Sequence, residues 1–305
     1  MQPLLGIALK IASALAFTLM SAGVKLVTER YPIGEVVFFR SAFALVPLLV
    51  WLSWRGDLIN AVRTDDLKGH LLRGIISTSG MFAGFVALSY LPLSDAVAIG
   101  YASPLITVVL AALVLKETVR AYRWSAVVIG FVGVIIMLLP HLNGSVTAGG
   151  AGVGALFALF GACCSAGATI QIRRLMARER TGAIVFYFSL LTTFMGLMTI
   201  VLGWRMPDLA DATLLVVIGI LGGIGQILLT LSYRHAETSL IAPFEYTTML
   251  WAVLIGWFAF SQLPQPAIAT GGVIVAAAGC FVVWRERQLG LRRAKEVEVG
   301  VQRHA

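Results

Sequence analysis

Long apolar stretches separated by short polar connections dominate this chain. They do not show the alternation of apolar and polar positions, over segments of about ten residues, that is typical of a membrane β-barrel. A helix needs about 20 apolar residues to cross a hydrocarbon core roughly 30 Å thick. The windows that meet this length lie at 4–27, 33–54, 70–91, 93–115, 122–140, 152–173, 182–203, 212–233, 239–260 and 267–284. The pattern therefore predicts an all-α integral membrane protein with ten transmembrane helices.

Composition supports this prediction. Of the 305 residues, 59% are hydrophobic and 12% are charged, whereas soluble proteins carry about 25% charged residues. This excludes a soluble enzyme and a disordered chain, and the three cysteines exclude a disulfide scaffold. The first window is too long for the apolar part of a signal peptide, so we expect it to remain as a helix.

The basic residues are distributed unequally between the two sides of the predicted membrane. Arg30 and Arg205 lie in connections on one side, whereas the connections on the other side and the C-terminal tail hold many more Arg and Lys residues. Loops rich in Arg and Lys stay in the cytoplasm. We therefore expect a multi-pass protein of the cell inner membrane with both termini in the cytoplasm. The net charge of +8 is explained by this topology, and no nucleic-acid partner is expected.

The sequence repeats itself weakly about halfway along. Ala87-Leu88-Ser89-Tyr90 in the third window matches Thr230-Leu231-Ser232-Tyr233 in the eighth. We expect a first five-helix repeat at 1–145, a second at 146–288 and a charged cytoplasmic tail at 289–305. Because five is odd, the second repeat enters the membrane from the opposite side. Inverted repeats are typical of secondary transporters, which bind substrate between the repeats near the membrane midplane.

A set of short motifs is spread over both halves of the chain: Phe38-Phe39-Arg40-Ser41, 96–104, Lys116-Glu117 and 242–246, followed by Leu250-Trp251, Gly256-Trp257 and the glycines of 272–279. In these motifs the chain resembles the drug/metabolite transporter superfamily, with two EamA-type halves. It departs from the family at Ser261-Gln262, where Gly-Glu is usual. The size and layout resemble the YddG-type exporters, which implies export of neutral or aromatic amino acids. Carriers of S-adenosylmethionine, riboflavin or nucleoside-like metabolites share the Pro-Phe-x-Tyr stretch and remain an alternative.

Charged residues inside apolar windows are costly and therefore functional candidates. Glu245 is the preferred candidate, for substrate binding or for coupling to protons, and facilitated diffusion without a coupled ion is equally compatible. Arg40 is a candidate too, with a structural anchor as the favoured interpretation. Lys10 and Lys25 lie toward helix ends, from which we expect their ammonium groups to reach the membrane surface.

Two prolines occupy comparable windows of the two halves. Pro104 and Pro243 each remove a backbone hydrogen bond and weaken the helix locally. Interrupted helices in equivalent positions of two repeats point to a substrate site. We therefore predict a hinge or gate at both prolines, the alternative being a simple bend.

Further candidates for substrate binding are polar or aromatic residues deep in the windows. Gln226, Phe82, Tyr101 and Tyr246 are selected by their depth and chemistry. The resemblance implies a cavity lined by the first, third, fourth, sixth, eighth and ninth helices. It adds Ser13, Phe17, Ser79 and Ser165.

Other classes of function lack their signatures. No Walker A motif or His-Glu-x-x-His motif is present, and the four histidines fall at helix ends or in the tail. We therefore expect no metal site, no cofactor and no enzymatic activity, and an intramembrane enzyme or a channel is a remote alternative. The glycine pairs Gly80/Gly84 and Gly219/Gly223 predict close helix packing within each half. The expected partners are a small-molecule substrate and the lipid bilayer, with the protein a monomer or a homodimer.

Overall fold

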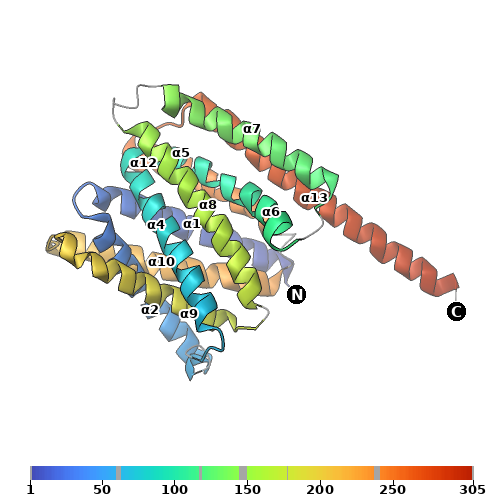
Figure 1. The fold of residues 1–305 in the computed structure, drawn as a ribbon, viewed down its shortest axis with the longest axis horizontal. Helices are drawn as coiled ribbons and strands as arrows, with labels where there is room; N and C mark the ends of the chain where they lie inside the picture. The colour runs from blue at the N-terminus through green and yellow to red at the C-terminus, as the bar shows by residue number, and fades with distance from the viewer. Residues whose placement is uncertain are drawn as a thin grey trace.

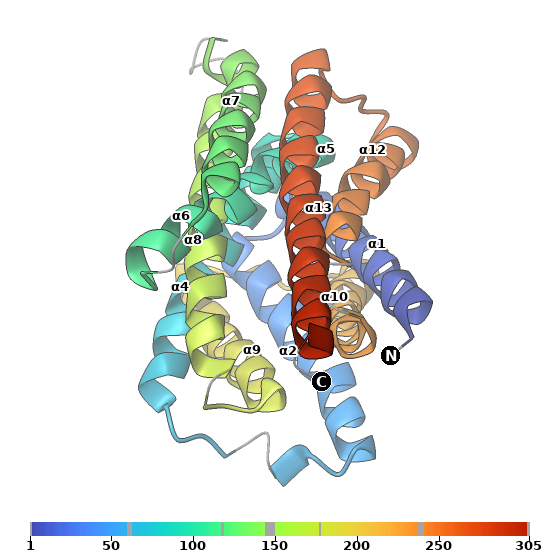
Figure 2. The ribbon, with the colours of Figure 1, turned by 90° about the vertical axis from the view of Figure 1, so that its right-hand side faces the viewer.

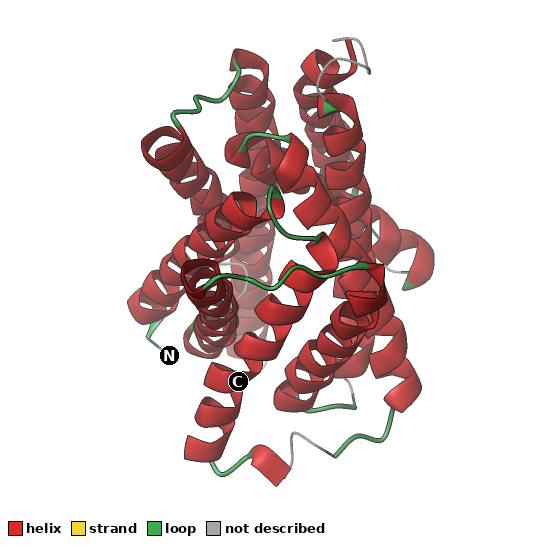
Figure 3. Ribbon diagram, turned by 90° about the vertical axis from the view of Figure 1, so that its left-hand side faces the viewer, coloured by secondary structure: helices red, strands yellow, loops and turns green. Residues whose placement is uncertain are grey.

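The computed structural model describes residues 2–59, 63–116, 119–143, 150–176, 178–236 and 241–303. Throughout these ranges the regular structure is helical, as Figure 3 shows. Nine helices in the described ranges are long and apolar enough to cross a membrane, and the tenth, Phe244–Phe260, is apolar but shorter. The predicted all-α membrane fold with ten helical spans is confirmed.

The chain order and bounds of the helices follow the ten predicted windows closely. They are α1 (Pro3–Thr28), α2 (Ile33–Trp54), α4 (Leu67–Tyr90), α5 (Leu93–Gly100), α6 (Ala102–Val114), α7 (Ala121–Asn143), α8 (Ala151–Met176), α9 (Thr181–Met198), the 3-10 helix η1 (Thr199–Leu202), α10 (Leu209–His235), the 3-10 helix η2 (Ala242–Tyr246), α12 (Thr247–Phe260) and α13 (Pro266–Arg303). In Figure 1 the last part of α13 extends beyond the bundle. The predicted tail therefore continues the last helix.

Two spans are interrupted, one in each half. The fourth span breaks at Tyr101, which ends α5 and precedes α6. Pro104 has no N–H to donate to the carbonyl of Gly100, so the α-helical ladder cannot run across this point. The ninth span begins as η2, with Pro243 in its first turn, and becomes α-helical only after Tyr246.

Helix packing follows a two-fold pattern that exchanges the halves. The large contact between α1 and α10 has its counterpart between α8 and α4, and the contact of α1 with α12 corresponds to that of α8 with α6. The helices α7 and α13 are equivalent to each other and pack together along one side of the bundle, as Figures 1 and 2 show. The two five-helix repeats are thus interleaved.

Three glycines of the two pairs, Gly80, Gly219 and Gly223, lie at contacts between the halves, which corrects the prediction that they pack within each half; the Cβ position of Gly84 faces open space. A Cβ atom on Gly80 of α4 would lie 2.8 Å from the Cβ of Cys164 in α8. A Cβ on Gly219 of α10 would meet Phe43 and lie 2.9 Å from the carbonyl oxygen of Phe39 in α2. Small residues allow helix backbones to approach closely, and here the close approach joins one repeat to the other.

Candidate functional site

One cavity opens between the two interrupted spans. It has a volume of about 180 Å³ and is walled by α6, α7, η2 and α13. We call it the tyrosine cavity. Its lining residues are Tyr101, Pro104, Leu105, Val108, Arg123, Ala126, Val127, Glu245, Tyr246, Ala278, Gly279, Val282 and Val283. Most of them are apolar, and the few polar groups come from both halves of the chain.

Two tyrosines at the interruptions of the two spans meet in the lining of this cavity. Tyr101 and Tyr246 are 145 residues apart; Tyr101 separates α5 from α6, and Tyr246 ends η2 directly before α12. Their ring centroids are 5.1 Å apart with the planes at 65°, an edge-to-face contact. The Tyr101 hydroxyl lies 3.5 Å from the carbonyl oxygen of Tyr246. The tyrosine pair therefore forms a direct contact between the two interrupted spans.

A buried lysine of the first helix pairs with the carboxylate of the cavity. The Nζ atom of Lys10 lies 3.3 Å from Oε2 of Glu245. The Lys10 side chain is 5% exposed, whereas that of Glu245 is 57% exposed and faces the tyrosine cavity. The Lys10 ammonium group therefore contacts one oxygen of the Glu245 carboxylate, and the exposed part of the carboxylate faces the cavity.

Arg123 adds a second cation to the same cavity. It lies in the first turn of α7 and lines the cavity together with Glu245. A guanidinium group binds carboxylates well, often through two parallel hydrogen bonds. A carboxylate at Glu245 binds ammonium groups. The site therefore combines both charges that the head group of an amino acid requires, beside an apolar wall.

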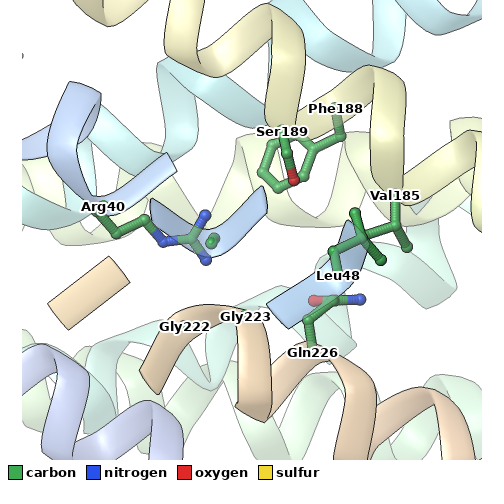
Figure 4. Close-up of a pocket in the computed structure, with 9 residues that line it drawn as sticks. Arg40, Leu48, Val185, Phe188, Ser189, Gly222, Gly223 and Gln226 are labelled. Atoms are coloured by element: carbon green, nitrogen blue, oxygen red, sulfur yellow. The ribbon is translucent and has the colours of Figure 1, made fainter. Parts of the chain in front are cut away.

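A second, much smaller cavity lies among α2, α9 and α10. Its volume is about 10 Å³ and its polar lining residues are Arg40, Ser189 and Gln226. Figure 4 shows the guanidinium group of Arg40 directed into it. We call it the Arg40 cavity. It shares no lining residue with the tyrosine cavity.

The predicted site residues thus fall into separate groups. Tyr101, Pro104, Glu245 and Tyr246 line the tyrosine cavity, and Arg40 and Gln226 line the other. The backbone of Pro243 lies in η2, next to the first group.

The remaining candidates line neither cavity. Ser13 is buried and donates to the carbonyl oxygen of Gly225, at 2.8 Å. Phe17 packs against Gly225 and, like Phe82, belongs to an apolar core cluster. Ser79 is half-buried on α4 and Ser165 is exposed on α8. Ser13, Phe17 and Phe82 therefore contribute to helix packing.

The two lysines differ from the sequence expectation, and both are buried. Lys10 turns toward Glu245, a partner 235 residues away that no local pattern identifies. Lys25 donates to the carbonyl oxygens of Leu88 and Leu91, at 2.9 and 2.6 Å. Those two carbonyls lie at the end of α4, and they satisfy the ammonium group inside the protein. Arg123 was also missed, because the sequence presents it only as a loop charge.

The structure shows no group of three or more His, Cys, Asp or Glu side chains able to hold a metal ion, within the residues it describes. The two His–carboxylate pairs found there are remote from the tyrosine cavity lining. His141 Nε2 lies 3.2 Å from Asp95 Oδ2, and His70 Nε2 lies 3.6 Å from Glu179 Oε2. Neither pair includes a third ligand of these types.

Comparison with known proteins identifies relatives along nearly the whole chain. Residues 4–139 match the EamA-like transporter family. The pseudopaline exporter of Pseudomonas aeruginosa is 31% identical over 288 residues, which cover 93% of this chain and 97% of the exporter. The S-adenosylmethionine uptake transporter of Rickettsia prowazekii is 27% identical, covering 83% and 84% of the two chains. The riboflavin transporter of Rhizobium johnstonii is 28% identical, covering 90% of each.

A solved structure shares the fold. It is described only as "Crystal structure of protein", has 18% identical residues and superposes with a TM-score of 0.64. The match covers 93% of this chain and 98% of the other. At this level of identity the likeness concerns the arrangement of helices alone.

Proposed function

Because this chain belongs to the EamA-like transporter family, we propose that it is a secondary carrier for small metabolites that contain an amino-acid group. It is a multi-pass membrane transporter and not an enzyme. The proposal concerns its substrate class and its mechanism. The observation that carries it is the meeting of Lys10, Glu245 and Arg123 at one cavity between the interrupted spans.

The charges of the site favour a zwitterionic group. The ammonium of an amino acid would bind the free side of Glu245, and its carboxylate would bind Arg123. Both interactions are charge-assisted hydrogen bonds, about twice as strong as neutral ones. The tyrosine rings and the valines of α6, α7 and α13 would contact an apolar or aromatic remainder.

The relatives support a metabolite carrier but not one particular cargo. S-adenosylmethionine contains an amino-acid group, whereas riboflavin does not. The cavity of about 180 Å³ is smaller than the roughly 300–1,000 Å³ of sites that enclose drug-sized ligands. It suits a neutral or aromatic amino acid, or the amino-acid end of a larger molecule whose remainder extends outside.

We propose that transport proceeds by alternating access between the inverted repeats. The interrupted helices at Tyr101 and Tyr246 provide equivalent flexible points, one in each repeat. Separation of the tyrosine pair on one side of the membrane would be matched by closure on the other. We further propose that both termini lie in the cytoplasm and that protons are a candidate coupling ion through Glu245.

The test is counterflow in proteoliposomes that contain the purified protein. Vesicles are loaded with one unlabelled solute, and entry of the labelled solute is followed without an imposed gradient. Neutral and aromatic amino acids, S-adenosylmethionine and riboflavin are compared. We expect accumulation of solutes with an amino-acid group, and a Glu245→Gln variant that folds normally should accumulate much less.

Two results would contradict the proposal. Counterflow of riboflavin alone would replace the zwitterion with a neutral aromatic ring as the recognised group. Equal counterflow of wild type and Glu245→Gln would show that the cavity carboxylate takes no part in recognition. Because counterflow requires no particular direction of net flux, the result is independent of whether the carrier exports or imports.

A further inference from the structure

We propose that the Arg40 cavity is a binding site for one small inorganic anion, with chloride as the probe. The site is distinct from the tyrosine cavity, and the inference does not depend on the proposed function. Its ligand neutralises a guanidinium group that is buried among α2, α9 and α10.

The first observation is the burial of Arg40 without a protein counter-ion. The residue is 7% exposed and lies in the second turn of α2. Within the described ranges, no carboxylate lies within 4.0 Å of its guanidinium group, and its Nε atom is buried without a hydrogen-bond partner. The nearest acid on the same helix, Glu35, accepts instead from the backbone N–H of Arg205, at 3.1 Å.

The second observation is that this guanidinium group lines a small space with polar neighbours. A hydroxyl from Ser189 and an amide from Gln226 share the lining with Arg40 (Figure 4). The volume of about 10 Å³ is close to that needed for one water molecule. A chloride ion is monatomic but larger than water, and the Ser189 and Gln226 side chains can donate to it.

Glycines bring α10 against the guanidinium group and define one wall of this space. A Cβ atom on Gly222 would lie 3.2 Å from Nε of Arg40, and Gly223 packs against Ala44 and Pro47 of α2. A larger residue at position 222 would displace the arginine, and one at position 223 would push α10 away from α2. The close helix contact therefore shapes a pocket around the charge.

A second buried arginine lies nearby but does not line the cavity. Arg73 of α4 lies over the ring of Phe188, with its guanidinium carbon 4.6 Å from the ring centroid. Phe188 also lines the Arg40 cavity, whereas Arg73 does not. Arg73 donates to the carbonyl oxygen of Ile184 at 2.7 Å, so its hydrogen bonding differs from that of Arg40. Arg40 is therefore the cation of this cavity, and because no acid of the described residues pairs with it, neutral water is a poor sole occupant.

The repeat relation explains why only one half of the chain contributes an arginine to this cavity. In the alignment of the second and seventh spans, Arg40 corresponds to Phe188 and Ser41 to Ser189. Both members of the first pair line the same cavity, which therefore lies where the two halves meet. One half supplies the guanidinium group, and the other supplies a ring and a hydroxyl.

The experiment measures the melting temperature of the purified full chain in detergent as chloride replaces gluconate at constant ionic strength. Gluconate is too large to enter the cavity. A ligand that binds the folded state raises the melting temperature with its concentration until binding saturates. We expect a saturable rise of several degrees in chloride and in bromide, and its loss in Arg40→Gln.

Arg73→Gln is the matched control, because it removes a buried arginine that already donates to a carbonyl. It should keep the halide response of the wild type at a lower baseline. Should Arg40→Gln fail to fold, Ser189→Val fills the space while keeping the arginine, and should weaken the halide response at least tenfold in concentration. Bromide diffusion in wild-type crystals locates the ion directly by its anomalous signal.

Three results would overturn the inference. One is equal melting in chloride and gluconate for the wild type, which leaves water as the occupant. Another is an unchanged halide response in Arg40→Gln, or in Ser189→Val where Arg40→Gln does not fold. The third is stabilisation by acetate or amino acids but not by halides, which would assign Arg40 to a carboxylate ligand.

Discussion

At the scale of single residues, the pair of Lys10 and Glu245 is the feature on which the proposed recognition of an amino-acid group depends. The pair lies 3.3 Å apart with the lysine buried and the carboxylate facing the cavity. Removing one member takes away a charge-assisted contact, which solvent at the 57% exposed carboxylate makes weaker than a fully buried pair. We expect Lys10→Met and Glu245→Gln each to reduce transport at least tenfold, and the double variant to lose less than the product of the two.

Lys25→Met is the matched control, since this lysine is also buried in α1 but donates only to carbonyl oxygens of α4. It should change stability without changing the response to Glu245→Gln. A double variant of Lys10 and Glu245 whose losses simply multiply would show that the two residues act independently.

The same assays at several pH values test proton coupling, because Glu245→Gln should abolish any dependence on a proton gradient.

The tyrosine pair makes a separate prediction about substrate size. The Tyr101 hydroxyl lies 3.5 Å from the carbonyl oxygen of Tyr246, at the limit of a hydrogen bond, whereas the ring makes an edge-to-face contact with the Tyr246 ring. We therefore expect Tyr101→Phe to transport within about twofold of wild type. Tyr101→Ala should enlarge the cavity and shift preference toward bulkier solutes, as measured by competition in counterflow. An identical substrate profile for Tyr101→Ala would remove this ring from the binding site.

At the scale of helices, the interleaved halves depend on glycines at their crossings. A Cβ on Gly219 would collide with Phe43 and approach the backbone of Phe39. Overpacking of this kind costs about 1–3 kcal/mol. Gly219→Ala should therefore lower the melting temperature by several degrees.

Gly84→Ala is the matched substitution. It also lies within a membrane helix, but nothing is found within 4 Å of the position its Cβ would take. Alanine favours the helix over glycine by up to about 1 kcal/mol, so this variant should melt at or above the wild-type temperature. Equal destabilisation by both substitutions would attribute the effect to the loss of glycine and not to the crossing.

The helices could be predicted from the sequence because membrane spans depend mainly on length and apolar character. The break in the fourth span was only partly predictable: Pro104 indicated its neighbourhood, but the junction at Tyr101 depends on packing against the ninth span. The partner of Lys10 was not predictable from one sequence. A pair separated by 235 residues depends on how α1 lies against η2, and no periodicity within either segment contains that information.

At the scale of the whole molecule, equivalent polar links tie the two halves together at opposite ends of the bundle. At one end, Asp211 near the start of α10 accepts from Arg30 at 2.7 Å and from Tyr31 at 2.8 Å, in the connection between α1 and α2. At the other end, Glu179, between α8 and α9, accepts from Thr64 and from the backbone N–H of Asp66, at 2.8 and 2.9 Å.

The helices that begin beside these links start in the same way. Asp66 caps α4 by accepting from the N–H of Gly69, and Asp208 caps α10 by accepting from the N–H of Asp211. Each link therefore joins one repeat to the start of the third helix of the other. Together they hold α1, α2 and α10 as one group and α8, α9 and α4 as another. The interrupted spans at the tyrosine cavity lie outside both links, which places the expected motion there.

The link at Glu179 predicts a pH-dependent stability. Burial alone would raise the pKa of Glu179. Hydrogen bonds from the connection between α2 and α4, and from the first turn of α4, nevertheless hold this pKa below the usual value of about 4.5. These donors are the Thr64 hydroxyl, the N–H groups of Asp65 and Asp66, and His70. Because the folded pKa is lower than the unfolded one, the charged carboxylate stabilises the fold above about pH 4.5, and this contribution is lost as the pH falls through the folded pKa.

Glu179→Gln should therefore lower the melting temperature by several degrees near pH 7, since hydrogen bonds to a charged group contribute about 1.5–3 kcal/mol each. The difference from wild type should shrink as the pH is lowered below about 4.5, where the wild-type carboxylate becomes protonated. Asp65→Asn is the control, because Asp65 contributes its backbone N–H to this link and that donor is unchanged by the substitution. A difference between wild type and Glu179→Gln that stays constant across this pH range would show that the link stabilises the bundle by shape and not through its charge.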